Sequence, residues 1–174
     1  QAWQKIWKNE AKLIIGSQGT LGIISEIEFS LIKPKSNHVL LVINLPNLKD
    51  LDRVVKAVLD YKPEAFECYD DQTLNLALNH AWDLTKNFKH SNRLSAFFSL
   101  LSDKLKPVPN LTLLANFASD SKDETLQQAQ SAKQALVNFN LSSEIKQTEK
   151  DQEKYWLIRH KSFGLLMKYS QGKK

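Results

Sequence analysis

Three of the chain's five glycines lie close together, at Gly16, Gly19 and Gly22, and form the first candidate site. Ser17 and Thr20 lie between them. Glycine adopts positive φ angles and lets a backbone approach a ligand closely, and the amides and hydroxyls of such a turn can bind a phosphate. The spacing matches neither the GxGxxG of a dinucleotide-binding turn nor the GxxxxGK[ST] of a P-loop. A tight turn with one bulge and no ligand is the alternative interpretation.

Arg159 is the second candidate. The pattern of apolar residues predicts a helix over about residues 150–169, in which Arg159 shares one stripe with Trp156, Phe163 and Leu166. An arginine in an apolar stripe is seldom buried without a partner, and its guanidinium matches a carboxylate in a bidentate way. The alternative is that Arg159 pairs with an Asp or Glu of the protein, or extends to water.

Other reactive side chains give no site. The four histidines lack the spacing of metal ligands, and we interpret them as surface or packing residues: His38, His80, His90 and His160. No metal is predicted, and no catalytic acid, base or nucleophile can be named. Cys68 is the single cysteine, so an intrachain disulfide is excluded, as is common in reducing compartments. Its apolar strand context, without a nearby histidine, predicts an inert buried thiol.

Two β-α-β patterns must position these residues. Strands are predicted over residues 38–45, 65–69, 111–117 and 141–148, and helices over residues 47–61 and 121–139. This order predicts a ferredoxin-like α+β fold, an antiparallel sheet with both helices on one face. One or two inserted helices are predicted over about residues 71–106, and the helix that carries Arg159 ends the fold.

A further strand is predicted before this fold. Residues 23–32 follow the glycines, and their second half alternates apolar and polar side chains. Pro34 ends the alternation, and residues 33–37 are predicted to be a linker.

Composition and charge set the broad class. The chain has 174 residues, 42% hydrophobic and 25% charged, which is an ordinary globular balance. No apolar run approaches the roughly 20 residues of a membrane span. A net charge of +5 would suit nucleic acid, anionic lipid or an acidic substrate, and the simpler interpretation is a solvated lysine-rich face. We expect a cytoplasmic location or one peripheral to a membrane, and, because Gln1 is not an initiating methionine, a piece of a longer protein.

The glycine segment resembles a known family. Residues 15–24, IGSQGTLGII, resemble the GSEGTLGI(I/V) segment of FAD-linked oxidases of the vanillyl-alcohol-oxidase type, in which this segment closes the flavin domain and lies along the FAD. Gln18 departs from the usual Glu and removes its charge. The resemblance implies FAD as cofactor of the parent protein and a cofactor-binding role for Gly16, Ser17, Gln18, Gly19, Thr20, Gly22 and Ile23.

The terminal helix carries a second resemblance. Residues 155–163, YWLIRHKSF, are similar to the W-x-x-R segment of the D-lactate and D-2-hydroxyglutarate dehydrogenase branch. There the arginine reaches the substrate carboxylate, which implies substrate binding by Arg159. Phe163 stands where some relatives have a polar substrate contact. Residues 66–70, with Glu67 and Asp70, resemble the family's E-x-x-D segment and receive no site role.

These resemblances imply the organisation and the reaction. Residues 1–34 would be the end of an FAD-binding domain and residues 35–174 a truncated cap domain that binds substrate. The parent enzyme would oxidise a D-2-hydroxyacid by hydride transfer to FAD, with the rest of that flavoenzyme as partner. We expect the 174-residue piece alone to be inactive. Some members of the branch bind a metal through a histidine pair beyond the point where this chain ends.

The alternative function is a non-catalytic ferredoxin-like module that binds a ligand or RNA. Residues 41–46, LVINLP, resemble the first-strand motif of an RNA recognition fold. RNA stacking needs exposed aromatic side chains on the central strands, and the basic-Gly-aromatic motif has no counterpart around residues 111–117. Nucleic acid is therefore not a predicted partner. A ligand-sensing domain of the same fold would have no need of the glycine segment.

Overall fold

The computed structural model describes residues 14–85, 98, 100 and 107–169. By its internal contacts the chain divides into two units, Gln1–Pro34 and Lys35–Lys174. Predicted features over residues 86–97, 99 and 101–106, His90 among them, lie outside the described residues.

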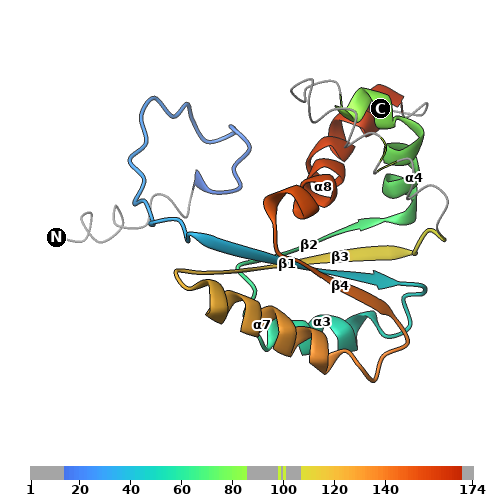
Figure 1. Ribbon diagram of the computed structural model, residues 1–174. Helices are drawn as coiled ribbons and strands as arrows, with labels where there is room; N and C mark the ends of the chain where they lie inside the picture. Colours follow the sequence, from blue (N-terminus) through green and yellow to red (C-terminus); the bar gives the residue numbers. More distant parts are fainter. Residues whose placement is uncertain (1–13, 86–97, 99, 101–106, 170–174) are drawn as a thin grey trace. The chain divides into compact units, whose positions relative to one another are not determined.

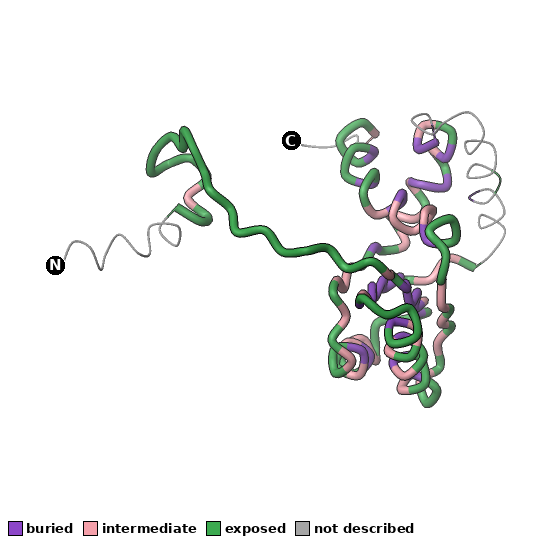
Figure 2. Tube along the Cα trace, turned by 60° about the vertical axis from the view of Figure 1, so that its left-hand side comes forward, coloured by how far each residue is buried: buried purple, intermediate pink, exposed green. Residues whose placement is uncertain are grey.

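The first unit contains a turn followed by an extended segment. The prediction of a strand over residues 23–32 is wrong here, because these residues pair with no neighbour. A strand is held by hydrogen bonds to a second strand, and the described residues of this unit, 14–34, contain none. The apolar side chains are exposed instead, Ile23 fully and Leu31 to 91%, as the green colour of this segment shows (Figure 2).

The second unit is built on a four-stranded sheet. Its repeated elements are β1 (Asn37–Leu45), α3 (Leu51–Leu59), β2 (Ala65–Asp70), β3 (Leu111–Ser119), α7 (Lys122–Ala135) and β4 (Ser142–Lys146). The strand order is β2-β3-β1-β4, and every neighbouring pair is antiparallel. The predicted ferredoxin-like α+β fold is confirmed, since β1-α3-β2 and β3-α7-β4 are its two halves.

The described residues of this unit also form helices outside the two β-α-β halves. They are α4 (Asp71–Asn79), α5 (Ala81–Leu84) and α8 (Glu149–Tyr169). The helices of the two β-α-β halves, α3 and α7, lie on one face of the sheet as predicted, whereas α4 and α8 lie on the other (Figure 1). Within the described part of the chain, no helix is both long enough and apolar enough to cross a membrane.

The sheet has a separate apolar core on each face because β1 is apolar in both directions. Leu41 and Ile43 pack with the α3 and α7 layer, while Leu40 and Val42 pack with α4, α5 and α8, and all four are at most 1% exposed. Alternate side chains of a strand point to opposite faces, so a continuous apolar run is what two covered faces require. The buried residues follow the strands and the inner sides of the helices (Figure 2).

The helix boundaries depend on local hydrogen bonds. Helix α3 begins four residues later than predicted, because the side chain of Asn47 accepts a hydrogen bond from the backbone N–H of Lys49 at 3.0 Å and so favours a turn. At the start of α7, the Ser121 side chain accepts a hydrogen bond from the N–H of Glu124. At the start of α4, Asp70 accepts one from the N–H of Thr73 at 2.8 Å. Both are N-caps, which satisfy donors that the helix itself leaves free.

Candidate functional site

The glycine turn is formed by positive φ angles in the first unit. Gly16 and Gly19 have φ of 84° and 81°, and Gln18 between them has φ of 51°. The N–H of Ser17 donates to the carbonyl of Ile14 at 3.0 Å. Both the N–H and the hydroxyl of Thr20 donate to the carbonyl of Ser17, at 3.0 and 2.7 Å. The segment is therefore two linked turns, which only left-handed backbone conformations allow.

This turn fits the flavin cofactor that the resemblance implies. A Cβ added to Gly16, Gly19 or Gly22 would meet no heavy atom within 4 Å, so there is space for a ligand beside these glycines. Ile23 is fully exposed and places an apolar side chain beside the turn. Room for close approach of a ligand to the backbone and apolar surface for a ring system are what such a cofactor needs.

Arg159 is held by a carboxylate of the protein. Its Nε lies 2.8 Å from Oε2 of Glu67 on β2, and the two side chains are 41% and 32% exposed. The buried Nε makes no hydrogen bond of acceptable geometry, so this contact is an ion pair without aligned donation. Of the two interpretations of Arg159, the structure therefore shows the pairing with a protein acid. Its two terminal nitrogens form no ion pair or hydrogen bond with the described residues.

Glu67 is the residue of this site that the sequence analysis missed. Side chains alternate along β2, and Glu67 points to the same face of the sheet as the buried Tyr69, which packs in the α8 layer. Register places Glu67 beside Leu114 of β3. An acidic residue on the covered face of a strand is the signal that could have indicated a cationic partner.

The stripe around Arg159 is the accessible face of α8. Phe163 is 70% exposed and Leu166 is 42% exposed, while Trp156 is half-buried. A different set of residues on α8 faces the core: Gln152, Leu157, Ile158, Ser162 and Leu165. Arg159 thus lies among apolar side chains that a ligand can reach, and not among side chains closed off in the interior.

The beginning of α8 is fixed to the sheet by a buried amide. The Nε2 of Gln152, which is 5% exposed, donates to the carbonyl of His38 on β1 at 3.2 Å and to that of Lys146 on β4 at 3.1 Å. Buried amide donors that are fully bonded rigidify their surroundings. The helix that carries Arg159 therefore starts from a fixed point on two strands.

The end of α8 is fixed to the inserted helices. The Tyr169 hydroxyl donates a short hydrogen bond to Asp83 of α5, and Lys168 lies 2.8 Å from the same carboxylate. The hydrogen bond to Asp83 raises the pKa of Lys168 well above its ordinary value. Because hydrogen bonds fix both of its ends, α8 is a rigid support for Arg159.

The three histidines in the described part of the chain do not gather into a site. His38 contacts the carbonyl of Lys35, while His80 and His160 stack on Tyr169 and Trp156. In the described residues no three His, Cys, Asp or Glu side chains are grouped so that they could hold a metal ion. The prediction of a buried thiol is wrong, because Cys68 is exposed at the edge strand β2, where no strand covers one side.

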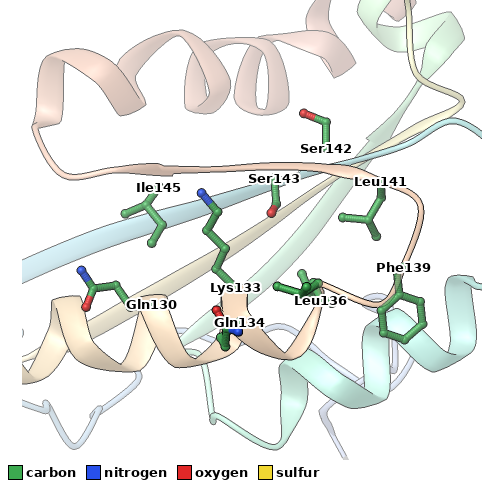
Figure 3. A pocket seen from close by; sticks show the side chains of 10 residues that line it. Gln130, Lys133, Gln134, Leu136, Phe139, Leu141, Ser142, Ser143 and Ile145 are labelled. Carbon is green, nitrogen blue, oxygen red and sulfur yellow. The ribbon is translucent and has the colours of Figure 1, made fainter.

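An open groove of about 740 Å³ lies between α7 and β4. Ser143 points from β4 toward α7, whereas Ser142 points away (Figure 3). The groove is lined by Gln130, Lys133, Gln134, Leu136, Val137, Phe139, Leu141, Ser142, Ser143 and Ile145. None of the predicted site residues is among them, and Arg159 is on the helix that covers the opposite face of the sheet.

The sheet does not offer the surface that RNA-binding modules use. One face is covered by α3 and α7 and the other by α4 and α8 (Figure 1). Phe117 of β3 is completely buried in the first of these layers. In the described strands, no central aromatic ring is therefore open for base stacking.

No curated protein sequence matches the chain. The family model described as "FAD linked oxidases, C-terminal domain" matches residues 33–174, well over half of the chain. That range includes the whole sheet, α8 and both members of the Arg159–Glu67 pair. The chain therefore belongs to the FAD-linked oxidases and carries their C-terminal domain.

Proposed function

We propose that the chain is part of a flavoenzyme that oxidises a D-2-hydroxyacid, of the D-lactate or D-2-hydroxyglutarate type. Its family makes it part of a flavin-linked oxidoreductase. We assign residues 1–34 to the end of the FAD-binding domain and residues 35–174 to the cap domain that binds substrate. The observation that carries the proposal is Arg159, a cation on an accessible apolar face whose terminal nitrogens bind no described residue.

The group that we assign to Arg159 is the carboxylate of the substrate. Two parallel N–H···O bonds from a guanidinium fix both the position and the plane of a carboxylate. The reacting α-carbon is bonded directly to that carboxylate, so orienting one orients the other. Phe163, at 70% exposure, and Trp156 flank Arg159 on the same face and supply apolar surface for the rest of the substrate.

We assign the glycine turn to the cofactor. Bound FAD supplies the two-electron acceptor of the reaction. The protein's part is to bring open backbone close to it, which the positive φ angles of Gly16 and Gly19 allow. The residues of this assignment are Gly16, Ser17, Gln18, Gly19, Thr20, Gly22 and Ile23.

The substrate assignment is tested with the intact flavoenzyme in the absence of oxygen. The flavin absorbance is followed after mixing with D-2-hydroxyacids, with their L enantiomers and with the corresponding alcohols that lack the carboxylate. We expect rapid bleaching with D-2-hydroxyacids alone. Equal bleaching by the alcohols would contradict carboxylate recognition, and no bleaching by any hydroxyacid would refute the substrate class.

The role of Arg159 is tested by substitution in the same enzyme. Arg159→Ala removes charge-assisted hydrogen bonds that are each worth about 1.5–3 kcal/mol, so KM should rise about 10- to 100-fold with unchanged flavin content. Arg159→Lys keeps the charge but loses the fork and should be intermediate. Arg53→Ala is the control, since Arg53 is a 69% exposed arginine on α3. Loss of flavin in Arg159→Ala would indicate a structural role.

A further inference from the structure

The contact between Glu67 and Arg159 uses only one side of the guanidinium. A guanidinium carries one N–H at Nε and two N–H groups at each terminal nitrogen. Glu67 lies 2.8 Å from Nε, which is the inner and buried nitrogen. The terminal nitrogens are left without a described partner on a side chain that is 41% exposed. An end-on carboxylate can therefore bind while Glu67 stays in place.

The backbone that supports Glu67 is fixed. Its strand β2 pairs with β3 over six residues, from Ala65 with Asn116 to Asp70 with Leu111. Tyr69, the next residue of β2 on the same face as Glu67, is anchored in the core at 6% exposure, and just before the strand Asn116 donates to Glu64 at 3.2 Å. The carboxylate of Glu67 thus projects from a fixed backbone and can hold Arg159, which projects from α8.

No other described carboxylate competes for this role. Glu67 is the one acidic residue that the described part of the chain places in contact with Arg159. The other nearby bond, from the Ser162 hydroxyl to the Arg159 carbonyl at 2.9 Å, involves the backbone and leaves the guanidinium untouched. The orientation of that guanidinium therefore depends on Glu67 together with the packing of α8.

We infer that Glu67 is a positioning residue, which holds Arg159 by Nε so that its terminal nitrogens are directed at the substrate carboxylate. This inference rests on the proposed function of Arg159. An arginine loses much rotamer freedom when it is ordered, and a partner that orders it beforehand removes that cost from binding. The negative charge of Glu67 alone would have the opposite effect, since it repels a substrate anion. Removing the charge of Glu67 should therefore raise KM if positioning dominates, and lower KM if repulsion dominates.

The test compares Glu67→Gln with wild type in the intact flavoenzyme, with a D-2-hydroxyacid that it oxidises. Glutamine keeps the shape and loses the charge. We expect KM to rise about 3- to 10-fold, with kcat within about twofold and with unchanged flavin content. Glu67→Asp keeps the charge with a shorter reach and should give a smaller rise in KM. Glu64→Gln, at a neighbouring glutamate that contacts His38, should leave KM unchanged.

A double-substitution cycle separates this inference from the proposed function. In an Arg159→Ala background, Glu67→Gln should have no further effect on KM, because the side chain that it positions is gone. If Arg159→Ala raises KM while Glu67→Gln leaves it unchanged or lowers it, Glu67 does not position Arg159, although Arg159 still binds substrate. If Arg159→Ala itself leaves KM unchanged, the proposed function is refuted and this inference with it.

Discussion

The imidazole of His80 lies flat on the ring of Tyr169, with centroids 3.6 Å apart and planes inclined by 13°. The Tyr169 hydroxyl donates to Asp83, so one side chain joins the last turn of α8 to α5 and to His80, the residue between α4 and α5. We expect Tyr169→Phe to lower the free energy of unfolding by about 1 kcal/mol, the value of one hydrogen bond. Tyr169→Ala, which also removes the stacked ring, should cost roughly 1 kcal/mol more.

Urea denaturation measures both changes. Tyr61→Phe is the matched control, because no hydrogen bond of its hydroxyl occurs among the described residues, and it should change stability by less than about 0.5 kcal/mol. If Tyr169→Phe were as stable as wild type, the hydrogen bond to Asp83 would not hold the end of α8.

Truncation of two phenylalanines should lower the free energy of unfolding by very different amounts. Phe117 is completely buried between the sheet and the helices α3 and α7, whereas Phe163 is 70% exposed on α8. Phe117→Ala removes buried contacts and leaves a cavity, which should cost about 3–5 kcal/mol. Phe163→Ala should cost about 0.5 kcal/mol or less. The midpoints of urea denaturation test this, and similar midpoints for the two variants would contradict the placement of Phe163 on an accessible face.

The cap of α4 should make stability depend on pH in the acid range. The hydrogen bonds from Thr73 lower the pKa of Asp70 from its ordinary 3.8. The folded-state pKa is thus below the unfolded one, so the stabilisation is present above pH 3.8 and is lost as the pH falls through the folded-state value. Asp70→Ala should cost about 1 kcal/mol at neutral pH, and its difference from wild type should shrink below pH 3.8.

Asp70→Asn separates the effect of the N-cap hydrogen bond on stability from the effect of the charge. Asparagine caps helices about as well as aspartate but does not titrate. Its stability relative to Asp70→Ala should therefore stay constant between neutral pH and pH 3, in denaturation curves recorded across that range. A difference that shrinks at low pH for this variant too would show that groups other than Asp70 are responsible.

The glycine turn can be tested without measuring turnover. An alanine at Gly19 would have to adopt the φ of 81°, at a cost of about 1–2 kcal/mol. If the turn binds FAD, Gly19→Ala should lower the flavin content of the purified intact flavoenzyme. Gly164→Ala is the control, because Gly164 lies in α8, outside the turn, with no positive φ and equally open surroundings. Equal flavin content in the two variants would argue against a backbone role for the turn.

The strands of the second unit could be predicted because the pattern of apolar residues in the sequence indicates which faces are buried. β1 is apolar at consecutive positions since both faces are covered, and β2 and β3 were located to within two residues. Helix ends could not be predicted equally well. The prediction for α7 extended to residue 139, but the helix ends at Ala135, because its last residues form turns that satisfy the free carbonyls.

The Arg159–Glu67 pair was beyond sequence reasoning for a specific reason. α8 carries apolar residues around much of its circumference, Trp156 and Phe163 in one direction and Leu157 and Leu165 in another. Periodicity therefore could not decide which side faces the core. The partner of Arg159 depends on how α8 is rotated about its own axis. That partner, Glu67, lies on a strand far away in the sequence. The lack of a strand over residues 23–32 has a related cause, since pairing is a property of two segments and not of one.

The order of the strands also bears on how the chain is made. Among the described strands, β1 is the first to leave the ribosome, yet its hydrogen-bond partners are β3 on one edge and β4 on the other. Both edges of this apolar nascent segment thus remain unpaired until β3 and β4 have been synthesised, and such edges promote aggregation. Translation of this protein should therefore depend on chaperones that bind the nascent chain before residue 111 emerges.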